Sequence, residues 1–590
     1  MRPSKFSALV VCAAALLCSA LFVTNAVAQK SSMPTKIPKI NYQERMLKNG
    51  LRVLSVEDHS SPTVSIQVWY HVGSKDDPQG RSGFAHLFEH IMFKSTKNMK
   101  SEMLDRLTED VGGYNNAFTA DDVTVYYEVV PSNYLETLLW AESDRLGGLN
   151  VDEPNFKSER AVVEEEFRQS YLAPPYGKLE LLIQQKSWVK HPYQRPGIGN
   201  IEELDAATLE NVRAFHSTYY RPDNATMVVA GDFDPKQLDA WVDKYFARLS
   251  KPSAPLPRVE IKEPARTSEQ RFVEHGQNVP LPAVVITYLA PPAASSDAVA
   301  LRIAEAILSS GNSSRLYRAL VYEQQIAQEA EASADLREDP GLFLFKAVLA
   351  SDKKPEDAER SLLAELKRMQ DAPVSAAELE KAKNQLVTAH LRERETNNGK
   401  AQALGEAAVL LGDPNRINTD IERLQSVTAA DVQRVMRQYF TDTNRVVIYY
   451  LPEAARTAQS SVNQTPAEAS TAASMPQASE VAMRASTANT AEKATPSSEK
   501  AAPSSVVNGL TETKTSDLPL DKNGKPVTGT VVVRVTIDEQ GRVVDAAALS
   551  GPKELRPAAI AAARQAKFAP TLEQGAPVKV TGTISYNFVP

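Results

Sequence analysis

The sequence predicts an α+β protein with two homologous sheet-plus-helix halves, then a disordered linker, then a small α+β domain. Three observations lead to this prediction. Residues 201–232 and 421–452 repeat each other at a constant offset of 220, which indicates a duplicated domain. Stretches in which apolar and polar residues alternate, as in strands, are interleaved with stretches of helical spacing. A run of Ala, Ser, Thr, Glu, Gln and Pro then separates the two halves from the last residues, and it is too poor in apolar side chains to fold.

The repeat sets the expected limits of the two halves. Each block reads as a helix, a short turn and a strand, with the strands at 225–229 and 445–450. The first half is predicted to span 40–250 and the second 256–455, joined by a Pro-rich segment at 251–257. The matched pairs are Ile201 and Ile421, Glu202 and Glu422, Leu204 and Leu424, Thr208 and Thr428, Val212 and Val432, Tyr219 and Tyr439, and Asn224 and Asn444.

Within the halves, the hydrophobic pattern predicts a short list of elements. Strands are expected at 51–56, 63–70 and 124–130, and helices at 84–93 and 100–111, the latter ended by two glycines. The second half is expected to open with a strand at 283–289 and a helix at 297–308. That helix carries no histidine pair, so only the first half would hold a metal.

Composition and length narrow the classes of protein. With 590 residues the chain is too long for one hydrophobic core, and 42% hydrophobic and 24% charged residues are ordinary for globular domains. The net charge of −7 gives no basis for nucleic-acid binding, so we expect no nucleic-acid partner.

Residues 1–28 are predicted to be a secretory signal peptide, which implies a periplasmic protein. A basic start precedes a mostly apolar run at 8–23, and small residues at 26–28 form a cleavage site. The apolar run is short for a membrane span, and retention as an uncleaved anchor is the alternative. Both cysteines, Cys12 and Cys18, lie in this segment, so the mature chain would have no disulfide and would bind metal through N and O atoms.

His86, Glu89 and His90 form the chemical centre of the first half. Residues i and i+4 of a helix lie one above the other, so the two imidazoles would face one point, as they do in zinc sites. Glu89 lies on nearly the same face, where it would accept a proton from a water molecule rather than bind the metal. The order His-x-x-Glu-His is that of the inverted zinc peptidases, and two helix histidines four apart by chance are the alternative.

The helical pattern at 156–170 is expected to provide a third ligand. A catalytic zinc takes three protein ligands and leaves one position for water. This stretch holds four glutamates, and such a run on a helix is often only a solvated face. Glu159 and Glu166, seven residues apart, would share one face, and the two valines between them, Val162 and Val163, are expected to face the core.

These residues resemble the pitrilysin/insulinase family of zinc metallopeptidases, in the branch that includes the mitochondrial processing peptidase. The resemblance covers 40–455 and includes the 76 residues from His90 to Glu166 and the segment at 112–119. It implies two halves that close over a peptide like a clamshell, with Zn²⁺ as the cofactor. The implied zinc ligands are His86, His90 and Glu166, with Glu89 as general base and Glu159 as a residue that orients the site. The implied substrate-binding residues, on an edge strand that pairs with the peptide backbone, are Asn116, Ala117, Phe118 and Thr119.

The second half departs from that family at one place. The family supplies an Arg and a Tyr seven residues apart that hold substrate near the metal, and the corresponding residues here are Val321 and Gln328. Arg315 and Tyr317 lie nearby at the wrong spacing. In two-subunit members one subunit carries the zinc site and the other the Arg/Tyr pair. The resemblance therefore implies a homologous partner subunit that supplies this pair.

Residues 456–514 are predicted to be the disordered linker, and 515–590 a small domain. Strands are expected at 529–537, 543–549 and 578–588 and an Ala-rich helix at 555–566. The run Gly529–Val533 and the hairpin turn Asp538–Arg542 resemble the C-terminal domain of TonB-type energy transducers. The Lys567–Thr571 stretch after the helix belongs to this resemblance. It implies a tethered binding module with an envelope-protein partner.

The function predicted from all of this is hydrolysis of peptides or unfolded polypeptides by an exported zinc metalloendopeptidase, the zinc-bearing subunit of a heterodimer. Two alternatives stay open. One is a non-catalytic assembly protein that keeps the fold. The other is a transport-associated protein in which the TonB-like domain has the main role.

Overall fold

The computed structural model describes residues 37–454 and, in the last domain, 527, 529–550, 552–566, 572–573, 576–577 and 579–588. The predicted signal peptide at 1–28, the predicted linker at 456–514 and the stretch at 567–571 lie outside the described residues. The chain divides into two compact units, Met1–Glu468 and Ala469–Pro590. The sheets of the first unit fall on either side of the Pro-rich joint, while the predicted limits 40–250 and 256–455 stay predictions.

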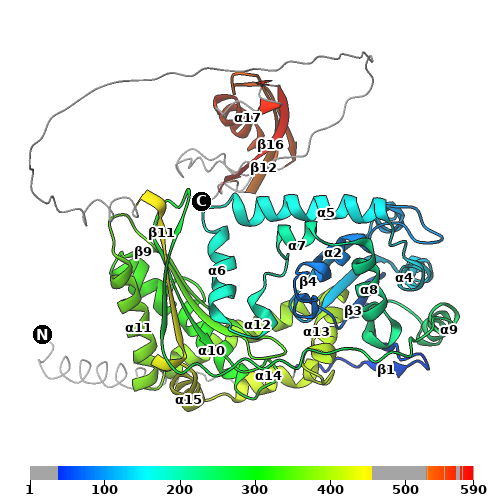
Figure 1. The fold of residues 1–590 in the computed structure, drawn as a ribbon, viewed down its shortest axis with the longest axis horizontal. Coiled ribbons are helices and arrows are strands. Elements are labelled where there is room, and N and C mark those ends of the chain that lie inside the picture. The colour runs from blue at the N-terminus through cyan, green and yellow to red at the C-terminus, as the bar shows by residue number, and fades with distance from the viewer. Residues whose placement is uncertain are drawn as a thin grey trace, which may run out of the picture. The chain divides into compact units, whose positions relative to one another are not determined.

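A six-stranded mixed sheet organises the first half (Figure 1). The central strand β3 has antiparallel neighbours on both sides, and seven of its eight residues are buried, so its apolar run packs on both faces. Its predicted bounds are confirmed. In spatial order the strands are β1 (Gln43–Met46), β2 (Arg52–Glu57), β6 (Ala225–Gly231), β3 (Thr63–Tyr70), β5 (Thr124–Pro131) and β4 (Tyr114–Thr119).

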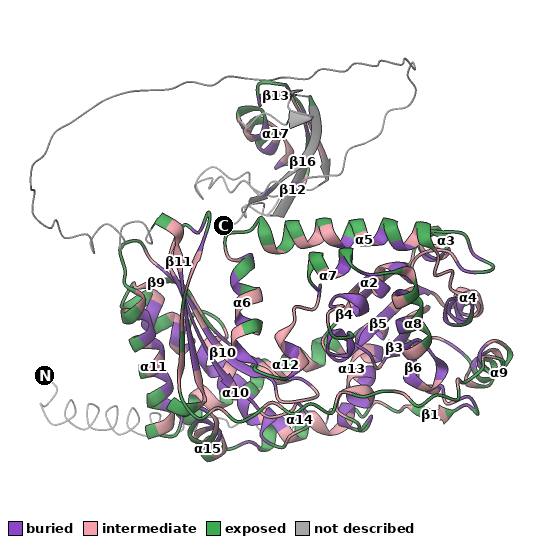
Figure 2. Cartoon of the chain, in the orientation of Figure 1, coloured by how far each residue is buried: buried purple, intermediate pink, exposed green. Residues whose placement is uncertain are grey.

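Helices cover one face of this sheet and enclose the main core of the first half (Figure 2). The helix predicted at 100–111 is shorter in the structure and occupies Met103–Glu109. The helices are α2 (Phe84–Ile91), α3 (Met103–Glu109), α4 (Leu135–Gly148), α5 (Glu153–Phe167), α7 (Ile201–Asp205), α8 (Leu209–Tyr219) and α9 (Pro235–Phe246).

The second half repeats this plan with a five-stranded sheet and its own core. The equivalence extends to single side chains: the Asn224 amide donates to the Tyr219 carbonyl at 2.9 Å, and the Asn444 amide donates to that of Tyr439 at 2.7 Å. The strands in spatial order are β7 (Gln270–Gly276), β11 (Arg445–Pro452), β8 (Ala283–Leu289), β10 (Leu342–Leu349) and β9 (Ala327–Asp335). The helices are α10 (Ala298–Ser309), α11 (Pro355–Asp371), α12 (Ala376–Glu393), α14 (Arg416–Ser426) and α15 (Ala429–Tyr439).

The halves exchange one helix each. Helix α6 (Gly177–Ser187) of the first half packs on β8 and β11 of the second, and α13 (Asn397–Val409) of the second packs on β3 and β6 of the first. The two helices begin 220 residues apart, so the exchange follows the repeat. Each crossing helix packs on the sheet of the other half, on the face that the helices of that other half do not cover, and forms a separate apolar cluster there. The first unit is therefore interlocked.

Polar contacts add to this interlock. Lys75 of the first half lies 2.6 Å from Glu338 of the second, and its ammonium also pairs with Asp122 at 2.8 Å. The backbone N–H of Glu338 donates to Asp122 at 3.0 Å. The connection between β9 and β10 is thus held against loops of the first half.

The last domain has a three-stranded antiparallel sheet, β13 (Val543–Ser550), β12 (Gly529–Ile537) and β16 (Val580–Phe588), with α17 (Arg556–Gln565) packed on it. A two-stranded ribbon is formed by β14 (Leu572–Glu573) and β15 (Ala576–Pro577). Val531, Val533 and Val535 point to one side of β12 and meet Ala559 and Ala563 of the helix. In the parts of the chain that are described, no helix is long and apolar enough to cross a membrane.

Candidate metal centre

Helix α2 is placed by its first residues. Gly83 has a φ of 92°, and a Cβ there would lie 2.6 Å from the Ile198 carbonyl oxygen, so this turn requires glycine. The buried Asp77 carboxylate accepts hydrogen bonds from the N–H groups of Gly83 at 2.6 Å and Ala85 at 2.9 Å. The helix then buries an apolar face whose members are Phe84, Leu87, Phe88 and Ile91.

The two histidines of α2 lie on the opposite side of that helix, where they meet α5. Their ring centroids are 5.0 Å apart. Glu166 of α5 lies against both, with 3.8 Å from its carboxylate to His86 Nε2 and 3.4 Å to His90 Nε2. One donor atom from each of the three residues falls within 4.8 Å of the others. The structure therefore brings together the three residues that the sequence suggested as ligands.

Glu159 lies on the other side of His90. Its carboxylate is 3.8 Å from His90 Nδ1, and it is anchored by Lys94 at 3.0 Å and by the Ser158 hydroxyl at 3.0 Å. A carboxylate on the far nitrogen of a metal-binding imidazole fixes its tautomer and orientation. Sequence reasoning missed Lys94, although its position four residues after His90 could have indicated it.

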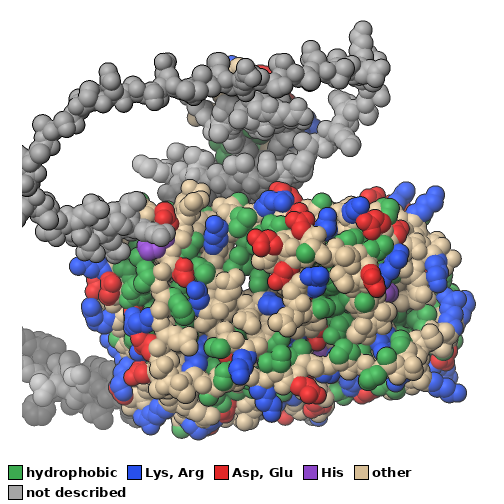
Figure 3. Space-filling model, viewed as in Figure 1, with side chains coloured by type: hydrophobic (Ala, Val, Ile, Leu, Met, Phe, Trp, Pro, Cys, Tyr) green, Lys and Arg blue, Asp and Glu red, His purple; other side chains and the backbone are tan. Residues whose placement is uncertain are grey.

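The glutamate run of α5 is divided between two environments. Glu165 pairs with Arg168 at 3.3 Å and is 56% exposed, so the solvated-face interpretation holds for it. Glu164 also pairs with Arg168, at 3.4 Å, but its side chain is only 14% exposed. Acidic and basic side chains are interspersed over the visible face of the molecule (Figure 3). The prediction that Val162 faces the core is wrong, because it is 47% exposed, whereas Val163 is buried. The buried side of α5 is formed by residues 156, 159 and 163. Val162 comes one residue before Val163, so its side chain points about 100° away from that of Val163 around the helix axis.

Glu89 lies beside the cluster rather than within it. Its carboxylate is 4.0 Å from His86 Nε2 and is mostly buried. Burial raises the pKa of Glu89, and Thr119 and His90 nearby act in the opposite direction. A carboxylate with a raised pKa next to a candidate metal position is suited to accept and return a proton.

The electrostatics of the cluster favour a cation between the rings. Burial and the neighbouring His90 lower the pKa of His86 to about 4. Burial acts on His90 in the same direction, but Glu159 and Glu166 outweigh it and raise its pKa to about 9. His86 is therefore a neutral nitrogen donor, and Glu159 and Glu166 supply negative charge beside His90. Two nitrogens and one oxygen are a donor set that suits zinc with one position left open. The residues present fit that metal.

The edge strand β4 borders the site, and α2 packs against it. The four predicted substrate-binding residues, Asn116, Ala117, Phe118 and Thr119, all lie on β4, which pairs only with β5 within the sheet. No described strand pairs with the other side of its backbone.

The second half has different chemistry at the equivalent positions. At the repeat offset, His86 and His90 correspond to Ala306 and Ser310, and Glu166 corresponds to Leu386. Within the described residues, the group on α2 and α5 is the one cluster of three or more potential metal ligands.

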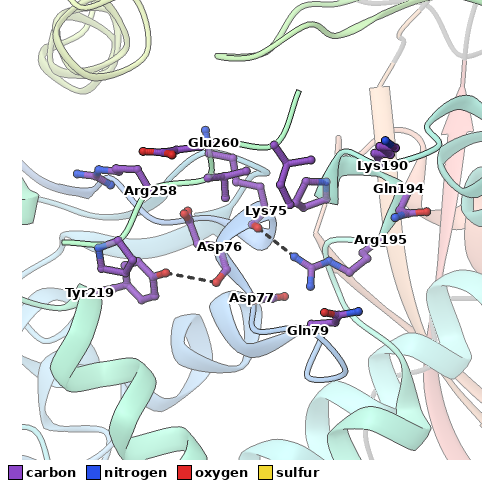
Figure 4. A pocket seen from close by; sticks show the side chains of 14 residues that line it. Lys75, Asp76, Asp77, Gln79, Lys190, Gln194, Arg195, Tyr219, Arg258 and Glu260 are labelled. Carbon is purple, nitrogen blue, oxygen red and sulfur yellow. Dashed lines mark hydrogen bonds between the residues drawn. The ribbon is translucent and has the colours of Figure 1, made fainter. Parts of the chain in front are cut away.

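A separate pocket of about 420 Å³ lies near the beginning of α2, where the joint between the halves meets loops of the first half (Figure 4). Asp77 lines it, and two arginines of its wall are held by backbone carbonyls: Arg195 donates to that of Lys75 at 2.9 Å, and Arg258 donates to that of His71, outside the pocket, at 2.7 Å. The pocket thus lies beside Asp77, which caps helix α2, the metal helix, and none of the three candidate ligands lines it.

Comparisons with known proteins agree with this geometry. Residues 52–198 match the model of "Insulinase (Peptidase family M16)", and 206–386 match that of the "Peptidase M16 inactive domain". The zinc protease PqqE of Helicobacter pylori is 31% identical over 421 residues, which are 70% of this chain and 94% of that protein. The chain belongs to the M16 peptidase family.

Further proteins are similar to this chain. The uncharacterized zinc protease YmxG of Bacillus subtilis is 24% identical over 67% of this chain and 95% of its own length. The crystal structure of a protease from Helicobacter pylori superposes with a TM-score of 0.67 at 30% identity, covering 70% of this chain and all of that one. The first half of the periplasmic protease PqqL from Escherichia coli shares the fold, with a TM-score of 0.59 at 19% identity over 72% of this chain and 95% of that one.

The last domain of this M16 chain has its own relatives. Residues 522–590 match the model of the "Gram-negative bacterial TonB protein C-terminal". Both parts of the predicted resemblance are thereby confirmed. The two M16 domains and a TonB-like domain are therefore joined in one chain.

Proposed function

We propose that this chain is an exported zinc metalloendopeptidase that hydrolyses peptides or unfolded polypeptides. The observation that supports it most is the convergence of His86, His90 and Glu166 with Glu89 beside them. Membership of a family whose relatives are named zinc proteases adds to it.

His86 and His90 would hold zinc through Nε2 and Glu166 through a carboxylate oxygen. When bound, zinc would lower the pKa of a water molecule at its open position and polarise the substrate carbonyl. Glu89 would take the proton from that water as it attacks the scissile carbon, then deliver it to the nitrogen of the leaving amine. Glu159 would keep His90 in the tautomer that leaves Nε2 free.

The substrate would bind as an added strand along β4. Backbone hydrogen bonds would then provide most of the affinity, and few side chains would be read. This mode suits short or unfolded polypeptides, because a folded segment has its backbone groups already paired. Asn116, Ala117, Phe118 and Thr119 would contact the bound chain.

The partner proposed for this chain is a homologous subunit. Val321 and Gln328 stand where the family places the Arg and Tyr that hold substrate, so a second chain would have to supply them. Co-purification from the native host checks this. A fully active enzyme in which only this chain is found would contradict it.

The proposed location is the periplasm, and the proposed partner of the last domain is an envelope protein. The TonB-like match and the likeness of fold to a periplasmic protease support both. Peptidase activity of the periplasmic fraction, measured after cell fractionation, tests the location. Recovery of the protein in the cytoplasm alone would oppose it.

Replacing Glu89 by Gln tests the central proposal. The variant keeps the shape of the side chain but cannot accept a proton, so we expect it to bind one zinc per chain and to lose about 100-fold or more in kcat. The matched control is Glu165→Gln, on the exposed side of α5, which should leave kcat unchanged. Wild-type hydrolysis by the Glu89→Gln variant, with its zinc bound, would refute the assigned base.

A further inference from the structure

A buried tyrosine supports the metal helix at the residue before the general base. The Tyr126 hydroxyl, on β5, donates a hydrogen bond of 3.1 Å to the Phe88 carbonyl oxygen. That oxygen also accepts the Met92 N–H of the helix at 3.0 Å. Because the Phe88 carbonyl belongs to the peptide group that joins Phe88 to Glu89, this bond fixes the backbone from which the general base projects.

Tyr126 is itself held by a charged group that is entirely buried. The Arg145 guanidinium of α4 lies 4.6 Å from the centre of the Tyr126 ring. It contacts Glu128 at 3.0 Å and also Glu142, and all three side chains are 1% exposed. A cation over an aromatic face attracts it, and the attraction is larger without water.

The buried triad of Arg145, Glu128 and Glu142 is poorly explained by a contribution to folding stability alone. Removing an arginine and two carboxylates from water is costly, and apolar residues of similar volume often stabilise a core as well or better. Some of its atoms are also without a hydrogen-bond partner: Glu128 Oε2, Glu142 Oε2, Arg145 Nε and Arg145 Nη1. A group kept at such cost suggests a positional role, and the side chain that it positions is Tyr126.

The direction of the hydrogen bond is secure. Burial raises the pKa of Tyr126 well above 10, so its hydroxyl keeps its proton and remains a donor to the Phe88 carbonyl at neutral pH. Phe88 is meanwhile confined by the rings of Phe215 and His216, whose centres both lie 5.6 Å from its own. The helix is therefore fixed through both the side chain and the carbonyl of one residue.

We propose that Tyr126, oriented by Arg145, is a positioning residue for Glu89. It acts through the Phe88 carbonyl and sets where the Glu89 carboxylate lies relative to the substrate. The proposal rests on the proposed peptidase function for its kinetic consequence. Its structural consequence, a restrained helix α2, does not depend on that function.

The chain offers a matched control for this contact. The Tyr220 hydroxyl lies 3.4 Å from that of Tyr126, in the same buried network, and no hydrogen bond joins it to α2 among the described residues. Tyr126→Phe and Tyr220→Phe each remove one oxygen atom from one buried ring. Only the first removes a bond to the metal helix.

The experiment compares kcat, KM, zinc content and amide hydrogen exchange in the full-length wild type and the two variants. For Tyr126→Phe we expect kcat to fall about tenfold with KM within about twofold, because small displacements of a catalytic group reduce the rate steeply. Exchange in the peptide that contains α2 should be faster, and zinc content should stay at the wild-type value. Tyr220→Phe should match the wild type in kcat and in exchange of α2.

Two results would overturn the proposal. One is unchanged exchange of α2 in Tyr126→Phe. The other is an equal loss of kcat in both variants, which would indicate general damage to the buried network. If the wild type, assayed together with its co-purified partner subunit, proves inactive on every peptide, the proposed function fails, while the exchange comparison still decides whether Tyr126 restrains the helix.

Discussion

Glu159 and Glu166 show how two residues of one type on one helix face acquire different tasks. Glu159 is 4% exposed and fixed by Lys94 and Ser158, so it reaches only the far nitrogen of His90. Glu166, whose side chain is 42% exposed, lies against both imidazoles from the open side. The first is a support and the second a proposed ligand.

This difference leads to a prediction about metal affinity. Glu166→Ala should lose stoichiometric zinc, because two ligands alone remain on the protein. Glu159→Gln should keep zinc but bind it about 10–100-fold more weakly, as expected when the outer partner of a histidine ligand is changed. Zinc competition with a chromophoric chelator measures both. Equal affinity in the two variants would show that the assignment of roles is wrong.

At this scale the sequence predicts the site in part. The spacing of His86, Glu89 and His90 is sufficient, because helix geometry alone aligns them. Pattern alone could not choose Glu166 from its neighbours, and it misplaced Val162. A helix face turns 100° per residue, so adjacent positions differ more in burial than a reading of the sequence can resolve.

The exchanged helices are the main feature that the sequence could not predict at the level of elements. Part of the strands and helices followed from hydrophobic period, and β3 and β12 were bounded correctly. The buried residues of α13 are mostly small, so hydrophobic period gives little sign of this helix and none of the sheet that covers it. The repeat at offset 220 places α6 and α13 in equivalent positions, and only the structure shows that both cross.

The crossing gives a prediction at Gly405, in the middle of α13. A Cβ at this position would overlap the Trp69 ring of β3, which is 1% exposed and held by a 2.9 Å hydrogen bond to Gln67. Alanine gains about 1 kcal/mol of helix propensity over glycine, whereas overpacking against a rigid ring costs about 1–3 kcal/mol. Because the Trp69 ring cannot turn away, the overpacking cost should exceed the gain in helix propensity. We expect Gly405→Ala to be less stable than the wild type by about 1 kcal/mol in urea unfolding.

The control for this change is Gln402→Ala, one turn earlier on α13, where the side chain is partly exposed. That substitution removes no packed ring and should leave stability within about 0.5 kcal/mol of the wild type. A stabilised Gly405→Ala variant would mean that the exchanged helix packs more loosely on the first sheet than the structure indicates.

Across the whole first unit, the two halves are joined by crossing helices and by buried charges. Lys400 of α13 pairs with Asp58 after β2, and Arg337 pairs with Asp121 at 3.0 Å. The repeat in the sequence predicts two halves but gives no information on these contacts, because they join residues more than 200 positions apart. Charged contacts between the halves also make their union sensitive to acid.

Glu338 provides a test of that sensitivity. Burial acts to raise its pKa, but His71 at 2.9 Å and Lys75 at 2.6 Å outweigh burial and lower the pKa to about 2, from 4.5 in an unfolded chain. A carboxyl with a depressed pKa stabilises the folded state above its unfolded pKa, and this contribution is lost as pH falls from 4.5 towards 2. The free energy of unfolding should therefore decline over this range partly because Glu338 takes up a proton.

Replacing Glu338 by Gln removes that titration. We expect the variant to be less stable than the wild type at pH 7, and the difference between them to shrink as pH falls from 4.5 towards 2. Urea unfolding of both proteins at a series of pH values measures the difference directly. Glu380→Gln, at an exposed position of α12, serves as the control and should follow the wild type at every pH. A difference between Glu338→Gln and the wild type that stays constant with pH would mean that Lys75 and His71 do not hold this carboxylate charged.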